Sequence, residues 1–215
     1  MPFGEVYGPN LTILQEWSDE EIENAIRYGI HPTGEPLLPP MPYEAYAGMA
    51  DADMEAIIAY LRSLEPVENE VPAALLVDNL TRADIRSVPD LAELPTDPIL
   101  GPAEDATPEE LGEYLVRNVA TCIKCHGSLN EDGTLDVEGP LVAQAIIYTD
   151  FGEVDGMPTI TQQALSAWST EDLVNYIGYR EGGRVFFMPM HAYRYMTDAD
   201  LEAIAAFLKS DANAE

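Results

Sequence analysis

The chain has 215 residues, with 39 Asp and Glu against 10 Lys and Arg, for a formal net charge of −29. Phosphate backbones and anionic lipids repel such a surface, so the composition argues against nucleic-acid binding and membrane adsorption. No run of about 18 or more apolar residues is present, which argues against a membrane-spanning helix. The acidity favours either a basic partner or a solubility adaptation such as tolerance of high salt.

Residues 1–65 carry two helix signals on either side of a Met41-Pro42 pair. Ser18 and Glu21 have the N-cap and N3 spacing of a capping box, which predicts that a helix begins there. The second predicted helix follows the Met-Pro pair. Its apolar residues share one face at helical spacing: Met54, Ile57, Ile58 and Leu61.

Residues 66–105 are rich in acidic residues and interrupted by six prolines. Such a composition predicts an extended linker that lies over the domains rather than a free random coil. A helix signal follows at once, because Thr107-Pro108-Glu109-Glu110 combines an N-cap residue, proline at N1 and acidic residues in the first turn.

That helix runs toward Cys122-Ile123-Lys124-Cys125-His126, which has the C-x-x-C-H pattern of c-type haem attachment. A zinc site would need a second pair of Cys or His ligands, and His31 and His191 do not form one by spacing. A thioredoxin-like redox pair would stand near a βαβ pattern, which the sequence does not show. The chain has only two cysteines, and both belong to this motif.

The last part of the chain repeats the first. Residues 188–210 align without gaps on residues 41–63, and 14 of these 23 positions are identical. Trp168-Ser169 likewise corresponds to Trp17-Ser18, and the first copy has four extra residues near His31. Ser169 with Asp172 and Thr197 with Asp200 predict two further helix starts. Few segments alternate at period 2, so the sequence predicts a mostly α-helical chain with long Pro-rich loops.

This order of motifs resembles the class I c-type cytochromes. Tandem-domain members, including cytochrome subunits of membrane-bound dehydrogenases, are the most similar group. The resemblance covers about residues 1–65 and 105–210 and is carried by the C-x-x-C-H motif, the repeated Met-Pro loops and the Trp-Ser helices. It implies an all-α fold: a partial cytochrome c-like domain over 1–65, a Pro-rich acidic linker over 66–105, and a haem-bearing domain over 106–215.

The resemblance also implies the ligands of the haem. Cys122 and Cys125 are expected to form thioethers, His126 to be the proximal iron ligand and Met188 the distal one. His/Met ligation raises the reduction potential, because a thioether favours ferrous iron. Met190 and His191 compete for the distal role, but the repeat places Tyr43 and Glu44 at their positions. Met41 becomes a distal ligand only if the first copy holds a second haem.

Four further residues are weaker candidates for contact with the haem. Trp168, like Trp17, could touch the propionates or simply pack. Arg184 and Arg194 could neutralise the propionates, although an exposed position is the ordinary one for arginine.

The first copy lacks a C-x-x-C-H motif of its own. The repeat places the corresponding histidine about 25 residues ahead of Met1. Three explanations stay open: upstream sequence that also supplies an export signal, a half-domain that has lost its haem, or a motif from another chain. We therefore expect one haem c, and a second only if upstream sequence or another chain supplies its motif.

The expected function is electron transfer rather than catalysis, in a periplasmic or other extracytoplasmic location. The expected partners are redox proteins, basic ones among them, in a larger membrane-associated complex, with no nucleic acid and no membrane span of the chain's own. One alternative is a structural or docking subunit, or the protomer of a cytochrome filament. Another is a peroxidase-like haem enzyme, if Met188 is not a ligand and leaves an open coordination position.

Overall fold

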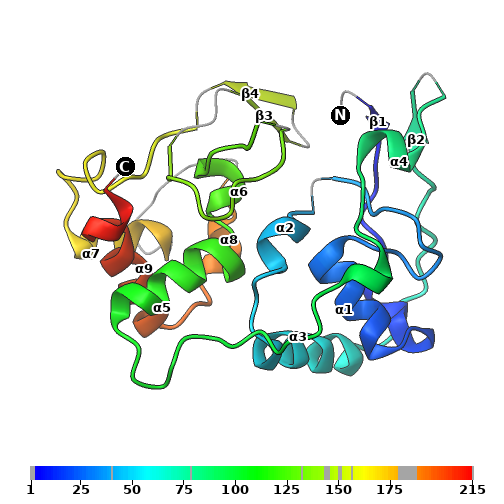
Figure 1. Cartoon of the computed structure of the whole chain (residues 1–215), viewed down its shortest axis with the longest axis horizontal. Helices are drawn as coiled ribbons and strands as arrows, with labels where there is room; N and C mark the ends of the chain where they lie inside the picture. Colours follow the sequence, from blue (N-terminus) through cyan, green and yellow to red (C-terminus); the bar gives the residue numbers. More distant parts are fainter. Residues whose placement is uncertain are drawn as a thin grey trace. The chain divides into compact units, whose positions relative to one another are not determined.

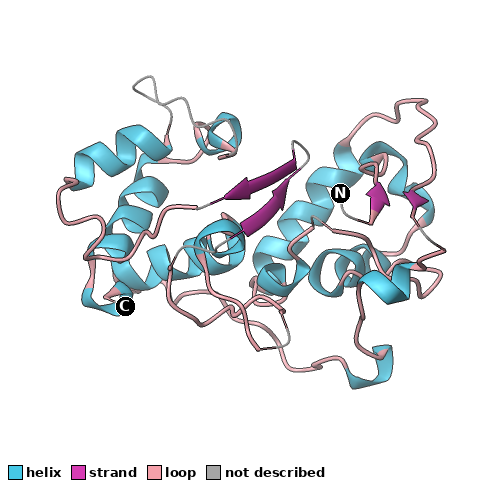
Figure 2. Cartoon of the chain, turned by 90° about the horizontal axis from the view of Figure 1, so that it is seen from above, coloured by secondary structure: helices cyan, strands magenta, loops and turns pink. Residues whose placement is uncertain are grey.

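The computed structural model describes residues 3–39, 41–77, 79–131, 133–142, 146–149, 152–155, 157–178 and 188–214. The chain divides into a first unit, residues 1–101, and a second unit, residues 102–215. Helices and loops make up most of both, as the sequence predicts, and the strands form only two short antiparallel pairs among the described residues (Figure 2).

The first unit is built around α1 and α3 (Figure 1). Its elements are β1 (Gly4–Glu5), η1 (Leu11–Glu16), α1 (Asp19–Tyr28), α2 (Tyr43–Tyr46), α3 (Asp51–Ser63), β2 (Leu75–Leu76), α4 (Arg82–Ile85) and η2 (Leu91–Glu93). Ser18 and Glu21 form the predicted capping box, and α1 ends at Gly29, whose φ of +67° suits glycine. The core cluster comprises Leu14, Ile22, Met49, Met54 and Ile58.

The residues after α3 pack onto this first unit. β2 pairs with β1, and the Ile99 amide donates to Asp51 Oδ2 at 3.2 Å. The Asn10 side chain donates to the Val67 carbonyl at 2.8 Å, and the Val67 amide donates to Thr12 Oγ1 at 2.9 Å. Residues 66–101 are therefore held by hydrogen bonds to loop, strand and helix residues that precede them.

The second unit is centred on two packed helices, α5 and α9 (Figure 1). Its elements are α5 (Pro108–Tyr114), the π-helical turn η3 (Leu115–Val119), α6 (Ile123–His126), β3 (Ile146–Thr149), β4 (Gly152–Asp155), α7 (Thr170–Ile177), α8 (Met190–Tyr193), α9 (Asp198–Lys209) and η4 (Asp211–Asn213). The predicted capping box at Ser169 is present, and the helix start predicted at Thr107 is also a capping box, with Glu110 at N3. The buried face of α9 includes Leu201, Ile204, Phe207 and Leu208.

One element of the second unit differs from the sequence prediction. β3 and β4 form an antiparallel hairpin in which Ile146 pairs with Asp155 and Thr149 pairs with Gly152. β3 has the sequence Ile-Ile-Tyr-Thr, a run of β-branched and aromatic residues that favours a strand without any alternation of polarity. A period-2 search misses such a segment.

Candidate haem-attachment site

The cysteine–histidine motif forms a short helix, α6, with Cys122 as its N-cap residue. Residues spaced by three and four positions lie on one face of a helix, so Cys122, Cys125 and His126 point to the same side. Both cysteines are free and partly exposed. The motif therefore offers two thiols and one imidazole along one edge.

The backbone ahead of the motif is unusual at two places. α5 passes into the π-helical turn η3, and Thr121 then has a φ of +52°. A left-handed conformation is strained for a β-branched residue, and π turns and strained residues both concentrate at functional sites. The Cys122 amide still reaches the Val116 carbonyl at 2.8 Å. This bend ends the helical run and starts α6 separately.

A single hydrogen bond fixes the orientation of His126. Its Nδ1 lies 2.7 Å from the Pro158 carbonyl oxygen. A carbonyl can only accept, so Nδ1 carries the proton and the Nε2 lone pair is left for a metal. Burial lowers the pKa of His126, while the bond to Pro158 acts in the opposite direction. The neutral imidazole, which is the form that binds iron, is thereby favoured.

The two thiols lie in an environment that keeps them protonated. Burial, with a smaller contribution from Cys125, raises the pKa of Cys122 to about 12. Burial likewise raises the pKa of Cys125. Zinc binding and thiol–disulfide exchange both use the thiolate. Among the described residues, no three or more His, Cys, Asp or Glu side chains gather as a metal-binding group.

The Met-Pro loop of the second unit leads directly into α8. Met188 is partly buried, and Pro189 is the N-cap residue of α8. Met190 is only 3% exposed and belongs to the core, whereas His191 is exposed. The Tyr193 hydroxyl donates to the Ala120 carbonyl at 2.7 Å. This bond ties the segment that follows Met188 to the turn just before the cysteine motif.

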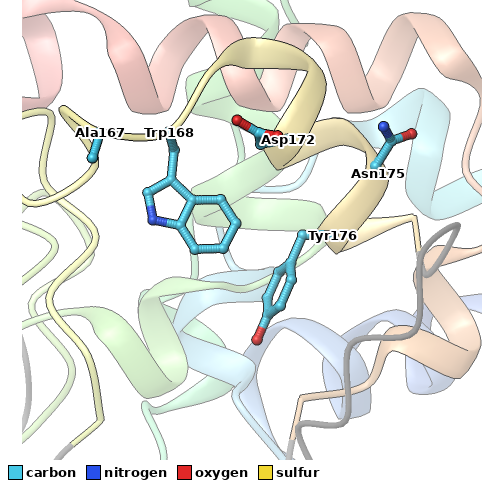
Figure 3. A pocket seen from close by; sticks show the side chains of 5 residues that line it. All are labelled: Ala167, Trp168, Asp172, Asn175 and Tyr176. Carbon is cyan, nitrogen blue, oxygen red and sulfur yellow. The ribbon is translucent and has the colours of Figure 1, made fainter.

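Trp168 lies at a surface hollow of about 360 Å³. Figure 3 shows its indole beside the phenol of Tyr176. Tyr176 lies on α7, together with Asp172 and Asn175. The two ring centroids are 5.3 Å apart at an interplanar angle of 75°. In the first unit the equivalent Trp17 packs edge-on against His31 instead, with ring centroids 5.0 Å apart and an interplanar angle of 89°. His31 stands at the four-residue insertion of the first copy, so the insertion supplies a different partner for the tryptophan.

The two arginine candidates have different outcomes. Arg184 lies outside the described residues. The Arg194 guanidinium lies 4.7 Å from the centre of the Tyr195 ring, and its Nη2 is 2.6 Å from the Tyr195 hydroxyl. Arg194 thus contacts the exposed side chain of Tyr195.

Met41 in the first unit is held by a residue from the segment after α3. The Arg86 Nη1 donates to the Met41 carbonyl at 2.8 Å, and Nη2 pairs with Glu44 Oε1 at 2.6 Å. The guanidinium lies 3.9 Å from the centre of the Tyr43 ring. The Met-Pro loop of the first unit is therefore fixed by Arg86.

Three residues of the site were missed by sequence reasoning. The Pro158 carbonyl and the Tyr193 hydroxyl act through contacts to residues 32 and 73 positions away, which no local pattern reveals. Pro158 had a weak signal, because its Pro-Thr-Ile-Thr segment resembles the Pro-Asn-Leu-Thr segment at Pro9. Thr121 had none, since threonine rarely adopts a positive φ.

Comparison with known proteins finds a family model that matches most of the second unit. Residues 107–208 match the model of cytochrome c oxidase, cbb3-type, subunit III. The fructose dehydrogenase cytochrome subunit of Gluconobacter japonicus is 28% identical over 97% of this chain and 45% of its own length. A diheme cytochrome c-type protein of Cereibacter sphaeroides is 27% identical over 96% of this chain and 72% of its own.

Other relatives have related names. One of the nicotinate dehydrogenase subunits of Pseudomonas putida is 31% identical over 97% of this chain, but only 18% of that protein is covered. The chain spans about half the length of the fructose and gluconate dehydrogenase cytochrome subunits, with 45% and 52% covered. Its motif and its helical fold agree with these relatives: residues 107–208 match a cytochrome c family model, and the chain is similar to c-type cytochromes that include cytochrome subunits of dehydrogenases.

Proposed function

We propose that this protein transfers electrons through one c-type haem, bound by thioethers to Cys122 and Cys125 and ligated by His126 and Met188. The observation that carries the proposal is the 2.7 Å contact between His126 Nδ1 and the Pro158 carbonyl. This bond orients the ring and leaves Nε2 free to bind iron. In metal-binding histidines the nitrogen that does not bind the metal typically donates its hydrogen in this way, which fixes the ring. When bound, the haem supplies the redox couple, and the protein supplies attachment, ligands and burial.

The choice of Met188 over Met190 is supported by their burial. Met190 already fills the core, whereas Met188 is only partly buried. The repeat adds that Met41-Pro42 stands at the equivalent position, where Tyr43 replaces Met190. The bond from Tyr193 to Ala120 holds the Met188 segment against the turn before the motif.

The domain organisation that we propose is a haem-bearing domain over residues 106–215, a partial cytochrome c-like domain over 1–65, and a connecting segment over 66–105. The family match over 107–208 and the division of the structure after Gly101 support the haem-bearing part. Most of the connecting segment packs on the first unit, so it also serves as a cover for that unit.

We further propose that the protein serves as a subunit or partner of a dehydrogenase or respiratory complex outside the cytoplasm. The names of the relatives support this assignment. The charge of −29 favours encounter with a basic docking surface. No helix among the described residues is long and apolar enough to cross a membrane.

The test is to produce the protein with c-type haem maturation and to examine its spectrum and haem content. Covalent haem should survive denaturing electrophoresis and be lost in Cys122→Ser/Cys125→Ser. Met188→Ala should abolish the long-wavelength absorption of methionine-ligated ferric haem and lower the potential, whereas Met190→Ala should keep both and only reduce stability. High-spin ferric haem in the unmodified protein, with peroxide turnover, would instead establish the enzyme alternative.

A further inference from the structure

The segment after α9 is bonded to the loop that carries Pro158, residues 157–162. α9 ends at Lys209, and the turn η4 follows over Asp211–Asn213. Asn213 is only 2% exposed, although asparagine is mostly found at protein surfaces. A polar side chain at this depth is normally hydrogen-bonded, so its partners indicate what it does.

The side chain of Asn213 joins two parts of the second unit. Its Nδ2 donates to the Ile160 carbonyl at 2.8 Å and to the Leu208 carbonyl at 3.0 Å. A side-chain amide nitrogen has two hydrogens, so both are used. The Leu208 carbonyl lies in the last turn of α9, where carbonyls have no acceptor role within the helix. One side chain therefore caps the end of α9 and holds the loop.

Backbone hydrogen bonds strengthen the same junction. The Gln162 amide donates to the Asn213 carbonyl at 2.7 Å. The Ile160 amide donates to the carbonyl of Leu141, a fully buried residue, at 3.0 Å. Residues 160–162 are thus bonded both to the segment after α9 and to the core of the second unit.

The hydrogen bond to His126 depends on this loop. Pro158 stands two residues before Ile160, and its carbonyl oxygen lies 2.7 Å from His126 Nδ1. Pro158 is exposed, so packing of its own side chain does little to hold it in place. A hydrogen bond weakens steeply when its angle departs from the favourable range. Release of the Asn213 bonds would therefore let the Pro158 carbonyl move and would loosen the imidazole ring.

The first unit has an equivalent junction that is built from different residues. There the Pro9 loop is tied to the segment after α3: Asn10 Nδ2 donates to the Val67 carbonyl at 2.8 Å, and the Val67 amide donates to Thr12 Oγ1 at 2.9 Å. Val67 and Asn213 each lie four residues beyond the end of the preceding helix. The side chains come from the loop in the first unit and from the segment after the helix in the second. The tie recurs although its residues do not, which indicates that the loop needs an anchor.

We propose that Asn213 is a positioning residue for the proximal ligand. It anchors the loop so that the Pro158 carbonyl stays in hydrogen-bond contact with His126. The inference rests on the proposed role of His126 as an iron ligand. A histidine whose other nitrogen donates such a bond is a more basic ligand, and a more basic ligand favours ferric iron. Asn213 thereby keeps the reduction potential lower than an unanchored loop would allow.

The test measures the reduction potential of Asn213→Ala in the haem-bearing protein. The variant removes both side-chain bonds, so the potential should rise, and the ratio of ferrous to ferric protein at a fixed solution potential should increase about three- to tenfold. Proton NMR of the ferrous protein should also show faster exchange of the His126 Nδ1 hydrogen with solvent. Two controls should leave both readings unchanged. Thr107→Ala destabilises the same unit by removing the N-cap of α5, and Asn10→Ala removes the equivalent tie of the first unit.

An unchanged or lower potential in Asn213→Ala overturns the proposal, and so does an equal change in Thr107→Ala, because either result would leave Asn213 with a structural role only. A second measurement needs no variant. In the unmodified ferrous protein, the Gln162 amide and the His126 Nδ1 hydrogen should be released by the same local opening, with protection factors within about threefold of each other. Protection of Nδ1 that exceeds that of Gln162 by about tenfold or more also overturns the proposal.

Failure of the proposed function gives a different result. The unmodified protein would then lack covalent haem, or its haem spectrum would show an iron without histidine ligation, before any variant is compared. That result overturns both proposals. Normal histidine-ligated haem in the unmodified protein, with no specific response to Asn213→Ala, overturns only the role of Asn213.

Discussion

Arg62 in the first unit and Lys209 in the second bind corresponding backbone carbonyls, those of Trp17 and Trp168. Two positions earlier the units differ, since Tyr60 is 65% exposed and Phe207 is 0% exposed. The first pair depends on contacts within the repeated segment, and those contacts recur because both partners are repeated. The second pair depends on α5, which lies outside the repeated segment. A repeat therefore preserves internal contacts and leaves external ones to be supplied separately.

The largest expected effect tests the face of α9 that α5 covers. Phe207→Ala should destabilise the second unit by about 3–5 kcal/mol, because it leaves a cavity between α5 and α9. Tyr60→Ala in the recombinant 215-residue protein should cost less than about 1 kcal/mol, as expected for an exposed side chain. Denaturant unfolding with hydrogen exchange read separately from peptides of each unit measures both. Equal costs would mean that the two faces are buried alike.

The next effect concerns added volume rather than lost volume. Ala203→Leu should cost about 1–3 kcal/mol, because α5 crosses α9 closely at Gly112 and leaves no room for a larger side chain. Ala56→Leu should change stability by no more than about 0.5 kcal/mol, since the same position on α3 is open. The same unfolding measurement applies. A large cost at Ala56 would contradict the comparison.

The shared contacts should respond alike in the two units. Arg62→Met and Lys209→Met should each destabilise their own unit by about 1–2 kcal/mol, because each leaves two backbone carbonyls without a donor. Arg82→Met is the control, since Arg82 is partly exposed, its pair with Glu35 is 3.8 Å long and its one bond to a carbonyl, that of Pro36, is 3.3 Å long, so that its loss should cost less. A loss in only one unit would show that the two cations are not equivalent.

The smallest effect is a pH dependence that both units share. Bonds from Thr107 lower the pKa of Glu110 below its ordinary value, and bonds from Thr81 do the same to the pKa of Asp84. A lowered folded-state pKa stabilises the fold above the unfolded value, and this stability is lost as the pH falls through the folded value. Glu110→Gln and Asp84→Asn should therefore lower the melting temperature at neutral pH more than in acid below the folded-state pKa values. An equal decrease under both conditions would exclude a contribution from the carboxylates.

Much of the fold could be predicted from local sequence. The capping boxes at Ser18, Thr107 and Ser169 begin helices where the sequence places them, because the N-cap bonds connect residues three positions apart. The β3–β4 hairpin could not, since its pairing joins residues across a turn and its β3 sequence does not alternate. The sequence predicts that residues 66–105 form an extended linker that lies over the domains. The attachment of residues 66–101 to specific sites on the first unit, through Arg86 and β2, could not be predicted because it depends on distant residues.

The sequence by itself determined the residues of the candidate site and their spacing: two cysteines and a histidine on one helical turn, and a Met-Pro loop that recurs. It also determined the similarity of residues 107–208 to a cytochrome c family. Only the tertiary structure decided that the Pro158 carbonyl orients His126, that Met190 is buried while Met188 is only partly buried, and that the Tyr60 face of α3 is open. The physical reason is range. Helix caps and ligand spacing act within one turn of backbone, whereas ring orientation and burial depend on residues tens of positions away that folding alone brings together.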